Sequence, residues 1–357
     1  MDKEDKNKLE KILNSSLEGK IPSEAELAYI AKLNDIDAIN ALLSTAREIC
    51  QMNFGNKVFA YGFLYISTYC KNTCKFCRYN ASNQDTYRYR RSIEEILDGA
   101  ISLKKEGVHL IDITTGEDPY IYYDPNGRDY LLNAISTVKE NVGLPIMCSP
   151  GAVPLDWLTK IKNAGANWLA LYQETYNRRL FESIKPNQSF DYRLKVKERA
   201  RDVGLLIEDG ILLGIGETID DCIEGIYNMK KLGANQVREM GFVPFEGAGI
   251  QNSPPLLYEM KIIALMRLVH QDKLIPASYD IDGLKGLQLR LMAGANVVTS
   301  LIPNTRFLGV ANPYLGLNEN KRSVEHLKPY LSEIGLKFAH LNDYLEWIER
   351  ESPKNNF

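Results

Sequence analysis

The sequence predicts an α/β protein whose main part is a (β/α)8 barrel. Between residues 58 and 300, eight short runs rich in β-branched and aromatic residues alternate with longer helical runs. Glycine stands at several junctions where a helical run gives way to the next β-rich run, because glycine readily ends a helix in the left-handed conformation. Eight repeats are the number that closes such a barrel. A doubly wound parallel sheet gives similar local patterns and is the alternative.

The predicted strands are short and lie at regular intervals along the chain. They cover residues 58–66, 110–114, 145–149, 168–172, 206–210, 236–242, 274–277 and 296–300. The clearest helical runs between them cover residues 93–106, 154–164, 190–203, 220–232 and 257–270. The junction glycines are Gly107, Gly165, Gly204, Gly233 and Gly294.

The chain is expected to have three parts. Residues 1–54 form an N-terminal helical extension, residues 55–303 form the barrel, and residues 304–357 form a C-terminal cap and tail. In the extension, Ser23 and Glu26 have the spacing of a capping box at the start of a helix.

Further helices are expected on both sides of the barrel. One covers residues 37–50, and two closing helices cover residues 323–334 and 341–350. The polar residues 352–356 are expected to fray, because chain ends that nothing holds are poorly ordered.

Charge and composition exclude several classes of protein. The 43 basic and 46 acidic residues give a net charge of −3, so there is no general electrostatic reason to bind nucleic acid or an anionic membrane. The charged start is no secretory signal, and no apolar run approaches the roughly 18 residues that span a bilayer. We therefore expect a cytoplasmic protein.

Three of the six cysteines form a compact group, Cys70, Cys74 and Cys77, in the pattern C-x3-C-x2-C. The group directly follows the first predicted strand, at the barrel end where active sites lie. Thiolates suit iron–sulfur clusters, and three of them on a four-iron cluster leave one iron open to a chelating small molecule. A structural zinc site is the alternative, although such sites almost always have four protein ligands.

The isolated cysteines are expected to be buried structural thiols, because a free cysteine usually behaves as a small apolar residue. They are Cys50, Cys148 and Cys222.

The cysteine pattern, with the aromatic Phe76 before the third cysteine, resembles that of the radical S-adenosylmethionine superfamily. The resemblance implies a [4Fe-4S] cluster on the three cysteines and S-adenosyl-L-methionine as second cofactor. It also implies that the reduced cluster cleaves S-adenosylmethionine to methionine and a 5′-deoxyadenosyl radical, which takes a hydrogen atom from the substrate. An electron donor such as flavodoxin or ferredoxin is then needed, and no side chain is expected to act as acid or base in the rearrangement itself.

Other segments narrow the resemblance to the branch that holds biotin synthase, the hydrogenase maturase and methylornithine synthase. The chain is most similar to the methylornithine synthase family, which implies isomerisation of L-lysine to (3R)-3-methyl-D-ornithine in pyrrolysine biosynthesis. A relative of the same branch with another small substrate is the alternative, and a zinc scaffold or a cluster carrier without catalysis is a second one. The segments that carry the resemblance are residues 54–56, 67–77, 116–120, 172–175, 275–278 and 293–300.

The resemblance also implies which residues bind the cofactor. Glu174 and Arg193 match positions that bind polar groups of S-adenosylmethionine, and an arginine fork suits its carboxylate. The remaining cofactor positions match the methionyl, ribose, adenine and amino-group contacts of the family; they are Ser149, Phe76, Gly116 and Glu117.

A second group of residues matches the family's pocket for its amino-acid substrate. Arg238 and Ser278 can hold a carboxylate, while Asp112 and Asp280 can neutralise amines. Hydroxyl contacts are expected from Thr299 and Ser300, at the end of the eighth strand. A carboxylate inside an apolar strand needs a partner, so the alternative for Asp112 and Arg238 is an internal ion pair across the barrel.

Overall fold

The computed structural model describes residues 1–250, 252–303 and 323–352 of the chain. Eight parallel strands follow one another around a sheet in the order β6-β5-β4-β3-β2-β1-β8-β7. Next to the remaining gap, the Val237 N–H at the start of β6 donates to the Leu274 carbonyl, two residues before β7, at 3.0 Å. The sheet therefore nearly closes on itself. This confirms the predicted barrel, and the alternative of an open doubly wound sheet is wrong.

All eight predicted strands are present, with ends that shift by at most three residues. They are β1 (Lys57–Tyr65), β2 (Leu110–Thr114), β3 (Ile146–Ser149), β4 (Trp168–Ala170), β5 (Leu206–Leu213), β6 (Gln236–Gly241), β7 (Pro276–Ser278) and β8 (Val297–Leu301).

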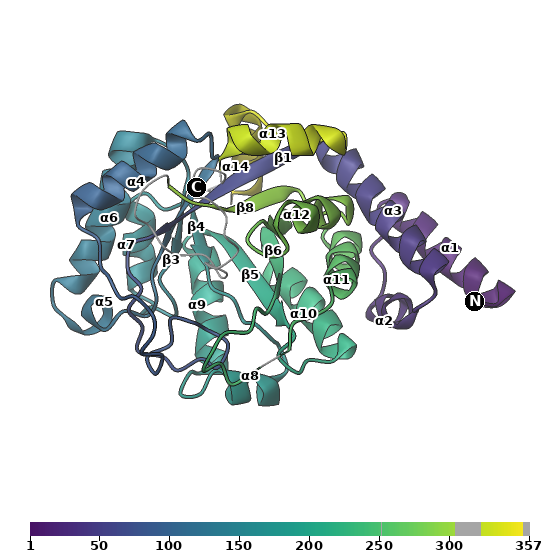
Figure 1. Cartoon of the computed structure of the whole chain (residues 1–357), viewed down its shortest axis with the longest axis horizontal. Coiled ribbons are helices and arrows are strands. Elements are labelled where there is room, and N and C mark those ends of the chain that lie inside the picture. Colours follow the sequence, from purple (N-terminus) through teal and green to yellow (C-terminus); the bar gives the residue numbers. More distant parts are fainter. Residues whose placement is uncertain (251, 304–322, 353–357) are drawn as a thin grey trace.

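Helices surround the strands, as Figure 1 shows. The barrel helices are α4 (Ile93–Lys105), α6 (Gly127–Val142), α7 (Trp157–Asn163), α9 (Phe190–Asp202), α10 (Ile219–Leu232), α11 (Leu256–Val269) and α12 (Gly283–Met292), with the short helices α5 (Pro119–Tyr123) and α8 (Arg178–Ile184) in the loops after β2 and β4. The helical runs predicted from the sequence correspond to α4, α7, α9, α10 and α11.

The N-terminal helices α1 (Lys3–Leu17), α2 (Glu24–Lys32) and α3 (Ile36–Phe54) lie on one side of the barrel, at the right of Figure 1. The predicted capping box is confirmed, because the Ser23 N–H donates to the Glu26 carboxylate at 2.8 Å while the Glu26 N–H donates to Ser23 Oγ at 3.3 Å. These helices pack against α10, α11 and α12. They therefore support the barrel from outside, away from its interior.

The C-terminal segment closes one end of the barrel. It comprises α13 (Val324–Glu333), the two-residue strand β9 (Lys337–Phe338) beside β1, and α14 (Leu341–Glu351). Trp347 of α14 stacks on Trp168 at the start of β4, with ring centroids 5.8 Å apart. Because Trp168 begins its strand, α14 covers the end of the barrel where the strands start.

Both closing helices were predicted, whereas β9 was not, because a two-residue strand has no sequence period to detect. The chain end that was predicted to fray covers residues 352–356, and of these only Ser352 belongs to the described residues. The predicted boundaries between the three parts of the chain, at residues 54 and 303, stay a prediction. Residues 304–322, which belong to the predicted C-terminal part, also lie outside the described residues.

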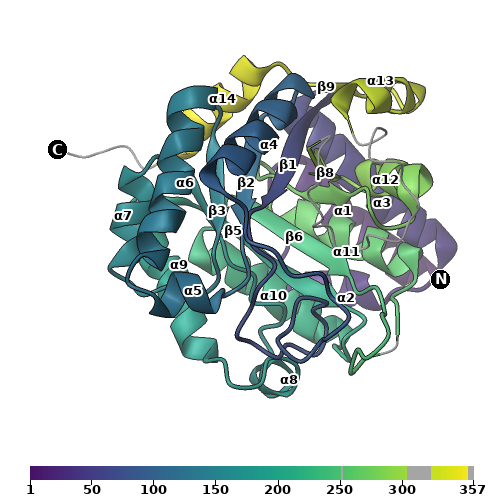
Figure 2. The ribbon, with the colours of Figure 1, turned by 60° about the vertical axis from the view of Figure 1, so that its left-hand side comes forward.

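The barrel interior is layered. Its first layer is apolar and is formed by residues near the strand starts together with α14; it contains Phe59, Leu110, Met147, Trp168, Leu206, Leu274, Val297, Tyr344 and Trp347. Figures 1 and 2 both show α14 at the top and α8, which follows β4, at the bottom. With one end sealed by apolar packing, a ligand has to enter from the end where the strands finish.

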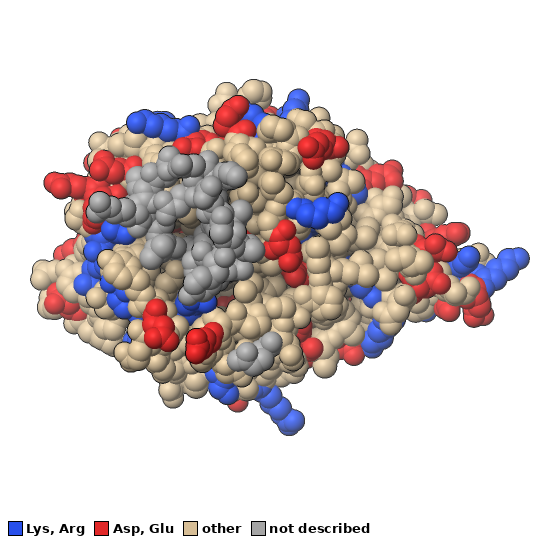
Figure 3. Space-filling view, viewed as in Figure 1, with Lys and Arg blue, Asp and Glu red and all other residues tan. Residues whose placement is uncertain are grey.

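The surface agrees with the near-balanced charge of the sequence. On the face shown in Figure 3, acidic and basic side chains are interspersed. Among the described helices, none combines the length and the apolar character that a bilayer crossing requires.

Two buried histidines tie elements together in their neutral form. The Ala60 N–H donates to His109 Nδ1 at 2.9 Å, so Nε2 carries the proton that it shares with the Ala339 carbonyl at 3.1 Å. His270 Nε2 lies 3.0 Å from the Ile226 carbonyl. Burial lowers the pKa of each of these histidines to about 4.

We predict that acid destabilises the protein through these two side chains. Their folded-state pKa lies below the ordinary value, so the stability they contribute is complete above about pH 6.5 and is lost as the pH falls towards 4. Urea unfolding at several pH values should show an uptake of up to about two protons on unfolding in this window. The double variant H109Q/H270Q should lose this uptake, whereas the control H326Q, at a partly exposed histidine, should retain it. An unchanged pH slope in the double variant would contradict the assignment.

Candidate active site at the carboxyl ends of the strands

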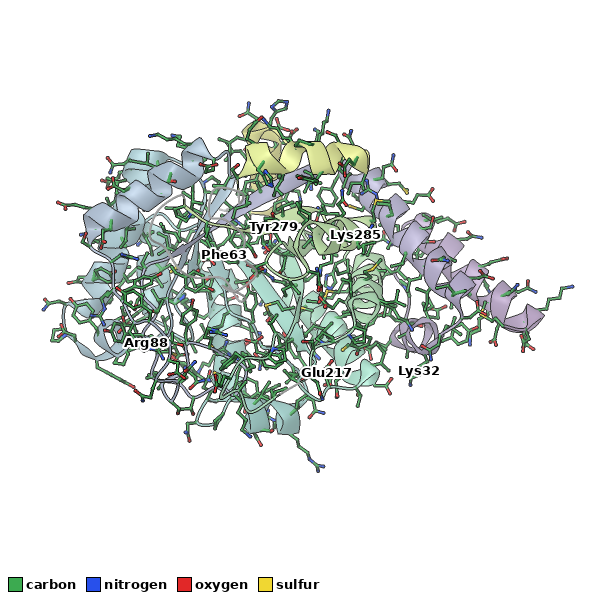
Figure 4. The ribbon with its side chains drawn as sticks, in the orientation of Figure 1. Lys32, Phe63, Arg88, Glu217, Tyr279 and Lys285 are labelled. Atoms are coloured by element: carbon green, nitrogen blue, oxygen red, sulfur yellow. The ribbon has the colours of Figure 1, made fainter. Side chains whose placement is uncertain are left out.

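The loop between β1 and α4 carries the three grouped cysteines and is held by one arginine. The Arg88 guanidinium donates to four backbone carbonyls of this loop: Tyr79 at 2.9 Å, Asn80 at 2.7 Å, Asn83 at 3.2 Å and, at a shorter distance, Thr68. In Figure 4 Arg88 lies among the loops at the lower left. Because these carbonyls have no regular secondary structure to pair with, one half-buried cation fixes the irregular path of the loop.

A buried carboxylate ties the cysteine loop to the loop that follows β2. Asp118 accepts hydrogen bonds from Ser67 Oγ at 2.6 Å and from Arg90 through two nitrogens at 2.9 and 2.8 Å. It also caps α5 by accepting from the Tyr120 N–H at 2.9 Å. Two neighbouring strand ends are therefore locked together next to the cysteines.

The grouped cysteines lie close enough to influence one another. Burial raises the pKa of the Cys77 thiol to about 12, and the neighbouring Cys74 and Cys70 add to the increase. Burial also raises the pKa of Cys70. Gln188 Nε2 donates to Cys74 Sγ at 2.9 Å. Thiols with raised pKa values form thiolates readily only when a metal replaces the proton.

The geometry also bears on the zinc alternative. In residues 1–250, 252–303 and 323–352, no three His, Cys, Asp or Glu side chains converge as they do around a single metal ion. Three thiolates that each bind a different iron of one cluster do not need to meet at one point. The isolated thiols Cys50, Cys148 and Cys222 are free and buried, as predicted.

The residues after β2 pass very close to the cysteine loop. A Cβ at Gly116 would lie 2.3 Å from the Tyr69 carbonyl oxygen and 2.8 Å from Cys70 Cβ, so only glycine fits there. The next residue, Glu117, accepts from the Ala152 N–H at 3.1 Å and pairs with Lys71 at 3.4 Å. These contacts place both predicted cofactor residues against the loop that carries the cysteines.

Glu174 and Arg193 also lie at this end of the barrel. Glu174 has a left-handed backbone (φ 67°) and pairs with the buried Lys185 at 3.1 Å. Arg193 donates to the Tyr172 carbonyl at 2.6 Å and lies 3.8 Å from Glu117. The buried Nε of Arg193 has no hydrogen-bond partner among the described residues. This donor is therefore available to a polar ligand.

A cavity of about 240 Å³ opens at this end of the barrel. Its walls include nine of the fifteen predicted site residues: Phe76, Cys77, Asp112, Ser149, Glu174, Arg238, Ser278, Asp280 and Ser300. Aromatic side chains line much of the rest, including Phe63, which Figure 4 shows in the middle of the barrel. The cavity therefore joins the third cysteine to the predicted substrate residues. The other predicted residues do not line it; they are Cys70, Cys74, Gly116, Glu117, Arg193 and Thr299.

Asp112 projects from β2 into the cavity and accepts three hydrogen bonds. The donors are Tyr61 Oη at 2.8 Å, Thr114 Oγ1 at 2.7 Å and Ser149 Oγ at 2.6 Å. Even so, burial raises the pKa of Asp112 to about 6. Ser149, which was predicted to contact the cofactor, thus bonds to a predicted substrate residue and connects the two regions.

Arg238 projects from β6 into the same cavity. It donates to Ser278 Oγ at 2.9 Å and to Thr299 Oγ1 at 3.0 Å. Its ion-pair partner is Glu208 at 3.7 Å. No ion pair joins Arg238 to Asp112 among the described residues. Thr299 therefore lies behind Arg238 and supports it.

Glu208 was missed in the sequence analysis. It is fully buried on β5, accepts from Tyr61 Oη at 3.3 Å, and has its pKa raised to about 7 by burial. The Tyr61 hydroxyl therefore lies between this carboxylate and that of Asp112. The sequence does contain a feature that could have identified Glu208, because this acid interrupts an apolar strand in the same way as Asp112 does. At the opposite wall, Ser300 Oγ donates to Asp280.

Comparison with known proteins agrees with this geometry. The sequence profile of the radical SAM superfamily matches residues 64–226, from the end of β1 to α10. The chain is 41% identical to the 3-methylornithine synthase of Methanosarcina barkeri over 331 residues, which is 92% of this chain and 93% of that protein. It is 29% identical to the [FeFe] hydrogenase maturase subunit HydE of Thermotoga maritima over 271 residues, covering 74% of this chain and 76% of the maturase.

A solved structure gives the same result for the fold. The crystal structure of methylornithine synthase (PylB) superimposes with a TM-score of 0.87 at 40% identity, covering 94% of this chain and 99% of that one. The family implies a [4Fe-4S] cluster and S-adenosylmethionine as cofactors. Similarity of this degree along nearly the whole length shows that the chain belongs to the radical SAM superfamily and, within it, to the 3-methylornithine synthase family.

Proposed function

We propose that this chain is a 3-methylornithine synthase that isomerises L-lysine to (3R)-3-methyl-D-ornithine. One observation carries the proposal: a single cavity connects the cysteine loop to a buried arginine with carboxylates around it. Lysine has one carboxylate and two amines, and this set of side chains is complementary to it. The identity of 41% to a named synthase supports the same substrate.

We propose that Cys70, Cys74 and Cys77 hold the iron–sulfur cluster. The donor set fits, because all three are free thiols in one loop that Arg88 and Asp118 fix. A cluster held by these thiolates would, together with S-adenosylmethionine, supply the radical chemistry that removes a hydrogen atom from the substrate.

The residues around the cysteine loop are complementary to S-adenosylmethionine. We assign its carboxylate to Arg193, because the unpartnered Nε is a buried donor. Glu174 and Glu117 offer carboxylates for its amino and ribose groups, and Gly116 lets the backbone approach closely. Phe76 lines the cavity directly before the third cysteine and offers a surface for the adenine.

The far wall of the cavity is assigned to lysine. Arg238 and Ser278 are placed to bind the carboxylate, and Asp112 and Asp280 to bind the two amines, with Ser300 supporting Asp280. Thr299 contributes by holding the arginine, since it does not line the cavity. These side chains bind and orient the ligand, and none is assigned a proton transfer.

The closed end of the barrel suits a reaction that has to exclude water. The α14 helix and the apolar layer seal the strand starts, so among the described residues the substrate region opens at the end where the strands finish. We further propose a cytoplasmic location, since six free thiols favour a reducing compartment, and a small redox protein as electron donor.

The cysteine assignment predicts a metal content that depends on the three thiols. Protein reconstituted with iron and sulfide without oxygen should be brown and contain about four iron atoms per chain. The triple variant C70A/C74A/C77A should be colourless, whereas the control C222A should keep its colour. A colourless wild type with one zinc ion per chain would support the zinc alternative. A brown protein that does not cleave S-adenosylmethionine when reduced would instead support a cluster carrier.

The substrate assignment predicts a product with the mass of lysine but a different retention time. Reduced enzyme, S-adenosylmethionine and L-lysine should give it in chromatography with mass detection. Removing the buried guanidinium in R238A should lower kcat/KM for lysine at least about 100-fold, as loss of one partner of a buried charged contact does. D112N should act in the same direction.

In both variants, cleavage of S-adenosylmethionine without lysine should persist, and the exposed-residue control E140Q should behave as wild type. Normal turnover in R238A would refute the pocket. Turnover of another amino acid in place of lysine would favour the alternative substrate.

The raised pKa of Glu208 predicts that this carboxylate lowers stability at high pH. Its folded-state pKa of about 7 lies above the ordinary value, so the stability linked to its proton is present below about pH 4.5 and is lost as the pH rises through 7. Between pH 5 and pH 8 the melting temperature of wild type should therefore fall relative to that of E208Q, by on the order of 2–4 °C. Comparing the two states of protonation in this way leaves aside any constant effect of E208Q on the contact with Arg238. A difference between the two proteins that does not change with pH would contradict this prediction.

A further inference from the structure

A buried group of charges lies outside the strands, behind the wall of the cavity. Arg290 of α12 is 1% exposed and donates to Glu259 of α11 through Nε at 3.1 Å and through a terminal nitrogen at 2.7 Å. The same guanidinium pairs with Asp282 at 2.9 Å. In Figure 4, α12 is the helix that carries the labelled Lys285. Burying an arginine in this way is costly unless its partners are well placed.

Two glycines leave the space that the ion pair of Arg290 and Glu259 occupies. A Cβ at Gly241 would lie 2.6 Å from Glu259 Oε1, and a Cβ at Gly286 would lie 2.6 Å from an Arg290 nitrogen. Any other residue at these two positions would collide with the ion pair. Gly241 also ends β6 and lines the cavity, so Glu259 lies directly behind the cavity wall.

Arg290 also fixes the segment after β7. It donates to the Ile281 carbonyl at 3.1 Å, in addition to its bond with Asp282. Asp282 has a left-handed backbone (φ 57°), which a residue other than glycine adopts only when its surroundings hold it there. Ile281 and Asp280 both line the cavity. The arginine therefore holds the backbone that carries Asp280.

A second carboxylate from the barrel faces the same group. Glu239 follows Arg238 on β6 and is buried. Because successive residues of a strand point to opposite faces, Arg238 enters the cavity while Glu239 points outward towards Arg290. Burial and the neighbouring Glu259 raise the pKa of Glu239 well above its ordinary value, while Arg290 acts against this increase. The arginine is thus the cation that keeps these acidic groups together.

We propose that Arg290 is a positioning residue for substrate binding: through Ile281 and Asp282 it sets the place of Asp280. The role of Asp280 as an amine ligand rests on the proposed function. Ser300 of β8 holds the carboxylate of Asp280, and Arg290 of α12 holds the backbone carbonyl of the next residue, Ile281. Loss of the arginine should loosen the backbone next to Asp280, while the hydrogen bond from Ser300 to the Asp280 carboxylate should remain.

The test compares R290Q with a matched control, R267Q. Arg267 of α11 is also fully buried, but it donates to carbonyls next to the strand starts, among them those of Gly294 and Lys273. Loss of either arginine should lower stability. Only R290Q should raise the KM for lysine, by roughly tenfold, with a smaller change in kcat and with unchanged cleavage of S-adenosylmethionine in the absence of lysine. R290K, which retains the charge but not the fork, should recover part of the loss.

Hydrogen–deuterium exchange without any substrate gives an independent measurement. In R290Q, exchange should accelerate selectively in a peptide that covers residues 279–283, whereas in R267Q this peptide should exchange as in wild type. If R290Q does not fold, D282N provides the same comparison with a smaller change. An unchanged KM, or an R290Q exchange pattern like that of R267Q, would overturn the proposal.

The two proposals fail separately. If wild-type enzyme does not convert lysine, the proposed function is wrong. The exchange measurement then still decides whether Arg290 holds the segment, since it needs no substrate.

Discussion

The structure depends on one constraint: charges inside a closed barrel must be neutralised by other side chains. The interior of this barrel excludes bulk water at one end, so Arg238 cannot be solvated in the usual way. Its charge is met by Glu208 at 3.7 Å and its donors by Ser278 and Thr299. These partners come from β5, β7 and β8, while the arginine comes from β6. Side chains of four strands are therefore held together by a single guanidinium.

The period of a β-strand extends this constraint to the outside of the barrel. Arg238 and Glu239 are consecutive, so β6 presents a cation to the cavity and an acid to the helices. Outside, Arg290 repeats the arrangement of one buried arginine among carboxylates. The cavity wall at β6 and β7 is thus held by an arginine on each face. This suits a site that has to orient a flexible amino acid.

The sequence was sufficient for the barrel because its signal is local and repeated. All eight strands could be predicted from short β-rich runs, and the cysteine loop from its spacing. The helices α5 and α8 were not predicted, because each is short and lies within the loop after a strand. The predicted strand 168–172 ends at Ala170, although Leu171 still donates to the Glu208 carbonyl at 3.1 Å.

Within the site, the sequence indicates residue types but not the contacts that they make. Asp112 was predicted as an acid in an apolar strand, whereas Glu208, which interrupts β5 in the same way, was missed. Thr299 was expected to touch the substrate, but its hydroxyl accepts from Arg238 and does not line the cavity. Whether the Thr299 or the Ser300 hydroxyl faces a ligand depends on small rotations of neighbouring strands. The amino-acid sequence alone does not reveal these rotations.

The raised pKa values in the cavity connect binding to protonation. Burial disfavours the charged forms of Asp112, which lines the cavity, and of Glu208 behind it, and raises their pKa values to about 6 and about 7. A ligand with two ammonium groups favours the ionised carboxylates, because an opposite charge lowers the pKa of an acid. A ligand without amines does not compensate the burial of these acids. The same burial that raises their pKa values therefore favours a diamino acid as the ligand.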